Sequence, residues 1–260
     1  MQADWSWDET LYRGSATYYA RGRLPYPQAL ADALRDELSL DGSGRLLDVG
    51  CGPGSLTGLL APLFAEAVGI DADAAMVREA GRAVPGARFL QLRVEQLPAG
   101  LARFRVIAAA QSFHWFESSV ARTLREVLEP AGSFVHVGAT THEGDGNVPR
   151  DEIAALVRAY LGPQRRAGAG VLPGGTRGDE RELLESYGFS NRRELEIART
   201  EVFERSEDDV VASVFSLSWA APHLFGDRLA AFEHDLRDLL RGRGPFRERA
   251  RDVTATVWDR

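Results

Sequence analysis

The chain has 260 residues, of which 44% are hydrophobic and 27% charged, and its net charge of −7 is unlike that of most nucleic-acid-binding proteins. All 31 basic residues are arginine, so the chain has no lysine for Schiff-base catalysis, pyridoxal phosphate attachment or a Walker phosphate loop. It shows no transmembrane-length apolar run, no signal-like start at Met1–Glu9 and a single cysteine, Cys51, so we expect a cytoplasmic protein without membrane or nucleic-acid partners.

Strand and helix patterns alternate in the first half of the chain. In chain order we predict a helix over 27–38, a strand over 45–49, a helix over 55–64, a strand over 67–70, a helix over 73–83, strands over 87–92 and 104–110, a helix over 118–128 and a strand over 133–137. This alternation favours an α/β fold with a doubly wound parallel sheet, whose ligand lies at the carboxyl ends of the strands.

The second half has weaker patterns. Helices are predicted over 151–161, 180–186, 210–219 and 228–240, and strands over 192–204 and 254–258. Between the first two helices, Gly162–Gly178 is rich in Gly, Pro and Arg and is predicted to be a mobile loop.

The most informative stretch is Leu-Leu-Asp-Val-Gly-Cys-Gly-Pro-Gly-Ser-Leu-Thr, which starts at Leu46. It predicts a strand, a turn without side chains and a helix N-terminus, where a ligand can lie against bare backbone. The G-x-G-x-G spacing differs from the G-x-G-x-x-G of nicotinamide-binding proteins. Asp48, just before the glycines, would repel a pyrophosphate but suits an ammonium group. S-adenosylmethionine carries an ammonium and no phosphate.

With this motif the chain resembles the class I S-adenosylmethionine-dependent methyltransferases. The resemblance continues through a second strand ending in Asp71, the turn Leu92–Pro98, the Gln-x-x-His-Trp-Phe sequence starting at Gln111, and Tyr19–Pro27. The last two are similar to a subgroup that includes trans-aconitate and other bacterial small-molecule methyltransferases. The resemblance implies a Rossmann-like, mostly parallel seven-stranded sheet with an antiparallel last strand. It also implies a lid and helix over residues 1–40, a cofactor-binding core over 41–140, and a small helical cap with the final strands over 141–260.

The same resemblance implies the cofactor site. Asp48 would orient the turn and the ammonium, and Asp71 would accept the ribose hydroxyls, although Asp71 could instead cap the next helix. The other implied cofactor-binding residues are Tyr19, Arg23, Gly50, Gly52, Gly54, Ala72, Met76, Val94, Glu95 and Gln111. Arg93 departs from the family pattern, because many relatives carry an aspartate there that accepts from adenine.

His114 is the candidate catalytic residue, as a general base or a substrate anchor, although a packed loop is the simpler interpretation. Trp115, Phe215 and Trp219 are candidates for the acceptor pocket, and they could equally be core. We expect methyl transfer to the O, N or C atom of a small-molecule acceptor, by in-line displacement helped by proximity. The alternative is a protein that binds S-adenosylmethionine without transferring methyl. No metal site is predicted, and a homodimer remains open.

Overall fold

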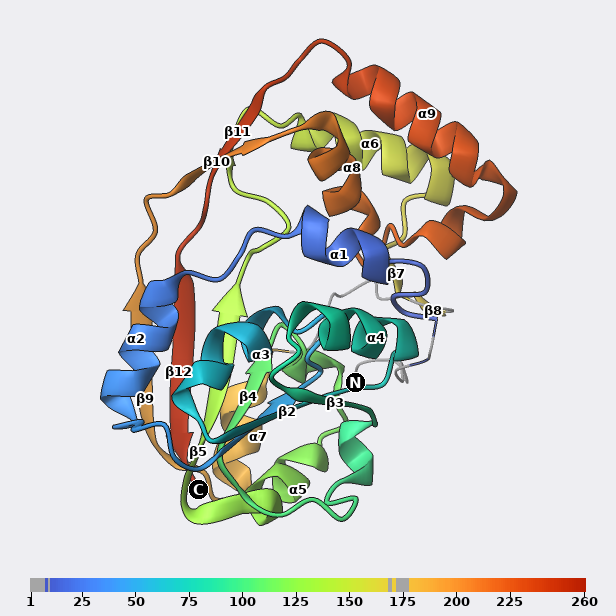
Figure 1. Ribbon diagram of the computed structural model, residues 1–260. Helices are drawn as coiled ribbons and strands as arrows, with labels where there is room; N and C mark the ends of the chain where they lie inside the picture. Colours follow the sequence, from blue (N-terminus) through green and yellow to red (C-terminus); the bar gives the residue numbers. More distant parts are fainter. Residues whose placement is uncertain (1–7, 9, 168–169, 172–177) are drawn as a thin grey trace. The chain divides into compact units, whose positions relative to one another are not determined.

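The computed structural model describes residue 8 and residues 10–167, 170–171 and 178–260 (Figure 1). The chain forms two compact units. The sheet unit consists of Tyr26–Ala139, Thr176–Ala198 and Asp252–Arg260. The helical unit consists of Met1–Pro25, Thr140–Gly175 and Arg199–Arg251. In the described part of the chain, no helix is both long and apolar enough to span a bilayer.

The sheet unit alternates strands with helices, as its sequence predicts. Its strands are β1 (Arg45–Val49), β2 (Glu66–Asp71), β3 (Arg88–Gln91), β4 (Phe104–Ala110), β5 (Leu128–Ala139), β9 (Ser190–Ile197) and β12 (Val253–Asp259). Its α-helices are α2 (Gln28–Glu37), α3 (Ser55–Leu60), α4 (Ala74–Ala83), α5 (Val120–Val127) and α7 (Glu180–Ser186). Short 3-10 helices are η1 (Ala61–Leu63), η2 (Val94–Gln96) and η3 (Phe113–Trp115).

The seven strands form one sheet in the order β3-β2-β1-β4-β5-β12-β9. Strand β1 pairs in parallel with both β2 and β4, so that Asp48 lies beside Gly69 on one side and Ala108 on the other. Strand β12 is antiparallel to both β5 and β9. The predicted seven-stranded, mostly parallel sheet is confirmed. The chain reverses its winding direction at β1 and β4, and ligands of doubly wound sheets bind at the strand ends beside such a point.

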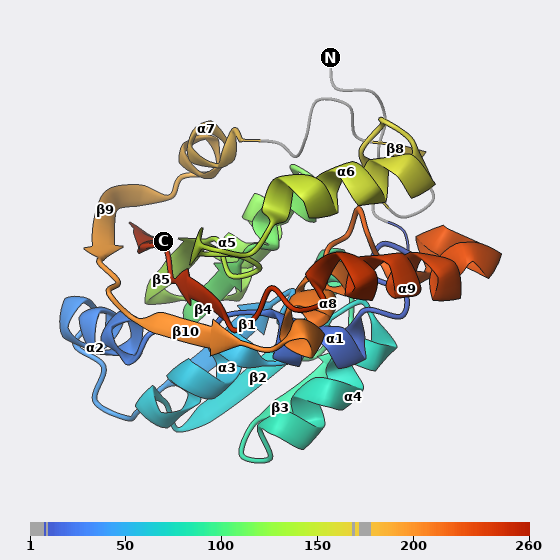
Figure 2. The ribbon, with the colours of Figure 1, turned by 90° about the horizontal axis from the view of Figure 1, so that it is seen from above.

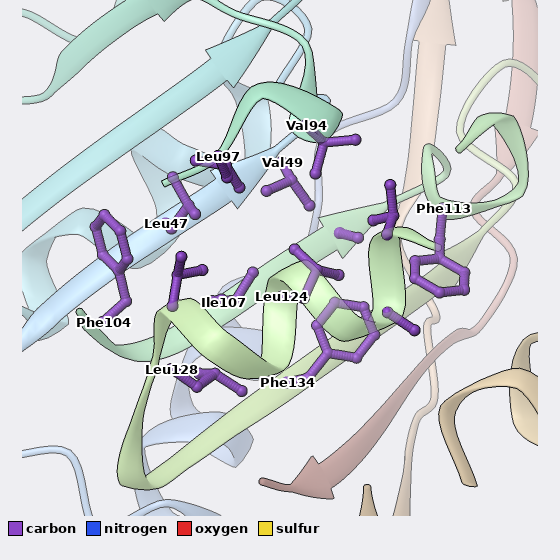
Figure 3. Packing of buried hydrophobic residues seen from close by; sticks show 14 of the residues in the cluster. Leu47, Val49, Val94, Leu97, Phe104, Ile107, Phe113, Leu124, Leu128 and Phe134 are labelled. Carbon is purple, nitrogen blue, oxygen red and sulfur yellow. The ribbon is translucent and has the colours of Figure 1, made fainter. Parts of the chain in front are cut away.

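Alternate residues of the strands pack on opposite faces of the sheet. On one face, Leu47 and Ile107 pack with Leu124 of α5, in the cluster that Figure 3 shows from close by. On the other face, Leu46 packs with Leu56 of α3. Figure 2 shows α3 and α5 on opposite sides of the strands. Each fully buried leucine of this kind contributes about 1.5–3 kcal/mol to folding, so both helix layers hold the central strands rigid.

The helical unit has its own aromatic core. Its helices are α1 (Ala16–Gly22), α6 (Arg150–Leu161), α8 (Glu207–Phe215), the 3-10 helix η4 (Pro222–Arg228) and α9 (Leu229–Leu240). Its strands are β6 (Asp145–Gly146), β7 (Arg166–Ala167), β8 (Gly170–Val171), β10 (Val202–Arg205) and β11 (Phe246–Arg249). Strands β10, β11 and β6 form an antiparallel sheet, and β7 pairs with β8. Phe225 and Phe232 stack with ring centroids 4.0 Å apart, and Phe215 packs edge-on against both.

One predicted strand is wrong. The alternating segment 192–204 forms two strands in different sheets, because β9 joins the seven-stranded sheet and β10 joins β11. The break lies at Arg199, whose buried guanidinium donates to the carbonyl of Pro25 (3.0 Å) and pairs with Glu201 (3.3 Å). The backbone N–H of Thr200 donates to the Glu201 carboxylate instead of a strand partner. Such local side-chain bonds compete with strand pairing.

Other boundaries differ less from the prediction. The helix expected over 55–64 is α3 followed by η1, and β5 is longer than the predicted 133–137. Within the predicted loop Gly162–Gly178, the structure forms the short pair β7–β8. Residues 168–169 and 172–177 of that loop lie outside the described residues. The predicted lid and cap remain predictions.

Candidate active site

The glycine turn joins β1 to α3, and its backbone conformation requires glycine. Gly50, Gly52 and Gly54 all have positive φ, at 66°, 54° and 85°. A Cβ on Gly50 would lie 2.5 Å from the Cβ of Ser112, whereas a Cβ on Gly52 would meet nothing within 4 Å. The turn is therefore closed on the side of Gly50 and open at Gly52, which leaves bare backbone for a ligand to approach.

Asp48 lies at the end of β1 and is 1% exposed. The hydroxyl of Thr57 donates to its Oδ2 (2.6 Å), but its Oδ1 has no hydrogen-bond partner among the described residues. Burial raises the pKa of the Asp48 carboxyl to about 7. A buried carboxylate oxygen without a donor is costly, so it is suited to a cationic ligand.

Asp71 lies at the end of β2, next to the same turn. Its carboxylate accepts from the backbone N–H groups of Gly52 and Asp73, both at 2.8 Å. Burial raises the pKa of the Asp71 carboxyl to about 6. The helix cap of α4 is supplied by Asp73, whose side chain accepts from the N–H of Ala75 (2.7 Å). A carboxylate has about four lone-pair sites, so Asp71 retains acceptors for two hydroxyl groups.

The other predicted cofactor residues of the sheet unit come from neighbouring strand ends. Met76 is 3% exposed on α4, and Val94 is 4% exposed on η2. The carbonyl of Ala72 accepts from the side-chain amide of Gln91 (3.3 Å). Glu95 pairs with Arg93 at 3.4 Å, so the arginine that replaces the expected acid engages the next acidic side chain in the turn.

The loop after β4 lies against the glycine turn. Gln111 has a positive φ of 54°, and its N–H donates to the carbonyl of Val137 (3.3 Å). The hydroxyl of Ser112 donates to the carbonyl of Val49 (2.7 Å), which ties the end of β4 to the end of β1. His114 and Trp115 follow in η3, with ring centroids 4.8 Å apart. The structure thus places His114 three residues beyond Gln111, in a short helix that starts next to the turn.

Sequence reasoning missed Thr57 and Ser112. Thr57 is the third residue of α3, and its hydroxyl donates to the buried carboxyl of Asp48. A hydroxyl residue one turn after a glycine motif preceded by an acid is a weak sequence signal. The contact of Ser112 with β1 depends on strand pairing, and no local pattern predicts it.

Four predicted site residues belong to the helical unit. The Arg23 guanidinium lies over the Tyr19 ring, 4.3 Å from its centroid, and donates to the hydroxyl (2.9 Å) and carbonyl (2.7 Å) of Ser216. Phe215 is fully buried in the aromatic core, which favours the core interpretation of this residue. Trp219 is partly buried at the edge of the same core. The functional roles of these four residues remain predictions.

The central strands of the sheet unit, with the glycine turn, match a known family. Residues 46–132 match the family model described as a methyltransferase domain. This stretch contains the glycine turn, Asp48, Asp71 and His114.

Individual relatives of the chain are methyltransferases as well. The chain is 32% identical over 177 residues to trans-aconitate 2-methyltransferase of Delftia acidovorans, which covers 64% of this chain and 62% of that protein. It is 30% identical over 104 residues to malonyl-[acyl-carrier protein] O-methyltransferase of Enterobacter lignolyticus, covering 39% of this chain and 41% of that protein. Across the curated relatives, the matches span 30% to 62% of the relatives' own lengths.

A solved structure supports the fold over nearly the whole chain. The N-methyltransferase NodS from Bradyrhizobium japonicum, in complex with S-adenosylhomocysteine, superposes with a TM-score of 0.53 at 12% identity. That alignment covers 96% of this chain and 98% of NodS. The predicted Rossmann-like fold is confirmed.

Proposed function

We propose that this chain transfers a methyl group from S-adenosylmethionine to a carboxylate of a small organic acid. The observation that carries the proposal is the buried carboxyl of Asp48 and the half-buried carboxyl of Asp71, beside a glycine turn that is open at Gly52. These hydrogen-bond acceptors fit S-adenosylmethionine, which has an ammonium group, two ribose hydroxyls and no phosphate.

Each end of the cofactor has a matching group in the sheet unit. The unbonded Oδ1 of Asp48 would accept from the ammonium, directly or through a water. The free lone pairs of Asp71 would accept the ribose hydroxyls, and the bare backbone at Gly52 gives the cofactor close approach. Val94, Glu95 and Met76 would border the adenine. When bound, S-adenosylmethionine supplies a methyl group on a positively charged sulfur.

The acceptor class is inferred from the relatives. Trans-aconitate and a malonyl group are both carboxylic acids, and both are named as acceptors of methyl by proteins similar to this chain. A carboxylate is already deprotonated at neutral pH, so it needs no general base. His114 would then act as a substrate anchor whose ring N–H donates to the acid, rather than as a base.

Location and partners follow as parts of the same proposal. The single cysteine, Cys51, is buried and free, which fits a reducing compartment such as the cytoplasm. The net charge of −7 favours a small-molecule acceptor over a nucleic acid.

Calorimetric titration of S-adenosylhomocysteine tests the cofactor site. We expect micromolar binding to wild type, and a Kd raised about 10-fold to 150-fold in Asp71→Asn, because the variant loses the equivalent of one charge-assisted hydrogen bond, about 1.5–3 kcal/mol. Asp36→Asn, on the exposed surface of α2, is the matched control and should bind like wild type. Equal affinity in Asp71→Asn, or no binding by folded wild type, would overturn the proposal.

A further inference from the structure

The Asp48 carboxyl meets no polar side chain at the positions in register with it on the neighbouring strands. Its partners in register are Gly69 on β2 and Ala108 on β4. Because side chains alternate between the two faces of a sheet, residues in register on neighbouring parallel strands share one face. The Asp48 carboxyl therefore lies between two small, apolar positions, and a polar partner has to come from the helix layer that covers this face.

Helix α3 supplies that partner. Leu56 and Leu60 of α3 pack in the same cluster as Ala108, so α3 covers the face on which Asp48 lies. Thr57, the next residue after Leu56, is fully buried, and its hydroxyl donates to Oδ2 of Asp48 at 2.6 Å. Oδ1 of the same carboxyl has no hydrogen-bond partner in the part of the chain that the structure describes. The helix thus holds one oxygen, and the other remains available to a ligand.

The Thr57 hydroxyl also favours the ionised form of Asp48. A hydroxyl that donates to a carboxylate stabilises its charge, and this bond opposes the rise in the pKa of Asp48 that burial causes. Asp71 on β2 raises the same pKa, whereas Cys51 in the turn stays a neutral thiol, because burial raises its pKa as well. Helix α3 (Ser55–Leu60) contains no ionisable residue. An ammonium group pairs with a carboxylate rather than with a neutral carboxylic acid, so the hydroxyl supports both the orientation and the charge that this ligand needs.

We propose that Thr57 is a positioning residue, which holds the Asp48 carboxylate so that Oδ1 receives the ammonium group of S-adenosylmethionine. The inference rests on the proposed function and adds a residue that acts through Asp48 without touching the cofactor. Because α3 starts directly after Gly54, one short segment both shapes the glycine turn and orients the acid beside it. A serine can fill this role, since it keeps the hydroxyl, whereas a valine has nearly the shape of threonine and lacks the donor.

Calorimetric titration of S-adenosylhomocysteine, which carries the same ammonium group, tests the inference on the full chain at pH 6 and pH 8.5. At pH 6 we expect Thr57→Val to raise the Kd about tenfold or more, the loss of one hydrogen bond to a charged group, and Thr57→Ser to stay within about threefold of wild type. At pH 8.5 the loss in Thr57→Val should be at least about threefold smaller, because the higher pH ionises Asp48 without the hydroxyl. Thr256→Val makes the same replacement on β12, which is not adjacent to β1, and should bind like wild type at both pH values.

The outcomes separate this inference from the proposed function. If wild type binds S-adenosylhomocysteine but Thr57→Val binds like Thr256→Val, the inference is overturned while the cofactor site stands. A loss that is equal at both pH values, or that Thr57→Ser shares, also overturns it, because either result shows a purely structural role. If Thr57→Val does not fold, Thr57→Cys, whose thiol is a weak donor, should show the pH-dependent loss, and a Kd equal to that of Thr57→Ser overturns the inference. If folded wild type does not bind at all, the proposed function fails and the inference fails with it.

Discussion

The buried carboxyl of Asp48 gives the protein a pH-dependent stability that a single substitution should remove. Its pKa rises from the ordinary 3.8 to about 7 because burial outweighs the hydrogen bond from Thr57. Between these values the native protein keeps a proton that the unfolded chain has lost. The free energy of unfolding therefore falls as pH rises through this interval and levels off above about pH 7.

The size of the effect follows from the same interval. At 1.36 kcal/mol per pKa unit, the whole rise from 3.8 to about 7 corresponds to about 4 kcal/mol, of which about 3 kcal/mol falls between pH 5 and pH 8. In Asp48→Asn the introduced amide does not ionise, and its oxygen can still accept from Thr57. The stability of the variant relative to wild type should thus increase by about 3 kcal/mol over this range.

Urea denaturation at pH 5, 6, 7 and 8 measures this difference directly, and comparing the two proteins cancels the contribution of Asp71 to first order. Asp36→Asn, which removes an exposed carboxyl of α2, serves as the control and should follow wild type. A stability difference between Asp48→Asn and wild type that stays constant from pH 5 to pH 8 would show that the pKa of Asp48 is not raised in the native protein.

Three further substitutions test the packing and the site. Gly22→Ala should destabilise the protein by about 1–3 kcal/mol in thermal melts, because its Cβ would lie 2.4 Å from a backbone oxygen of α8. The control Gly81→Ala, on the open face of α4, should be neutral or stabilising. Equal melting temperatures of the two variants would contradict this prediction. Glu248→Gln should cost about 3–5 kcal/mol in urea denaturation, since it leaves two arginines without their shared buried partner; a loss below 1 kcal/mol would show that water replaces the pair. His114→Gln should leave the Kd for S-adenosylhomocysteine within twofold and raise the KM for the acid, and unchanged steady-state kinetics would exclude the anchor role.

The sequence predicts best where local pattern and tertiary environment agree. The bounds of β1 and β4 are as predicted, because each is a short apolar run buried on both faces of a parallel sheet. The glycine turn is equally local, since three positive φ values at alternate residues allow little but glycine. The sequence allows two roles for Asp71, ribose binding and helix capping, and in the structure Asp73 caps the helix.

The helical unit was less predictable because contacts distant in sequence create it. Glu248 is fully buried only because Arg150 and Arg205, far apart in the chain, meet its two oxygens. Nothing near Glu248 in the sequence distinguishes it from an exposed glutamate. The split of the segment 192–204 has the same origin, since the buried Arg199 bonds to Pro25, more than 170 residues earlier.

Methyl transfer by this protein can be detected from the mass of the product. Purified protein is incubated with S-adenosylmethionine carrying a trideuterated methyl group and with trans-aconitate, and the products are analysed by mass spectrometry. We expect a monomethyl ester of the acid that carries the label, together with S-adenosylhomocysteine, and formation of both should drop at least tenfold in Asp71→Asn at subsaturating cofactor. Folded protein that binds S-adenosylhomocysteine but forms no labelled ester from trans-aconitate or any other small carboxylic acid would contradict it.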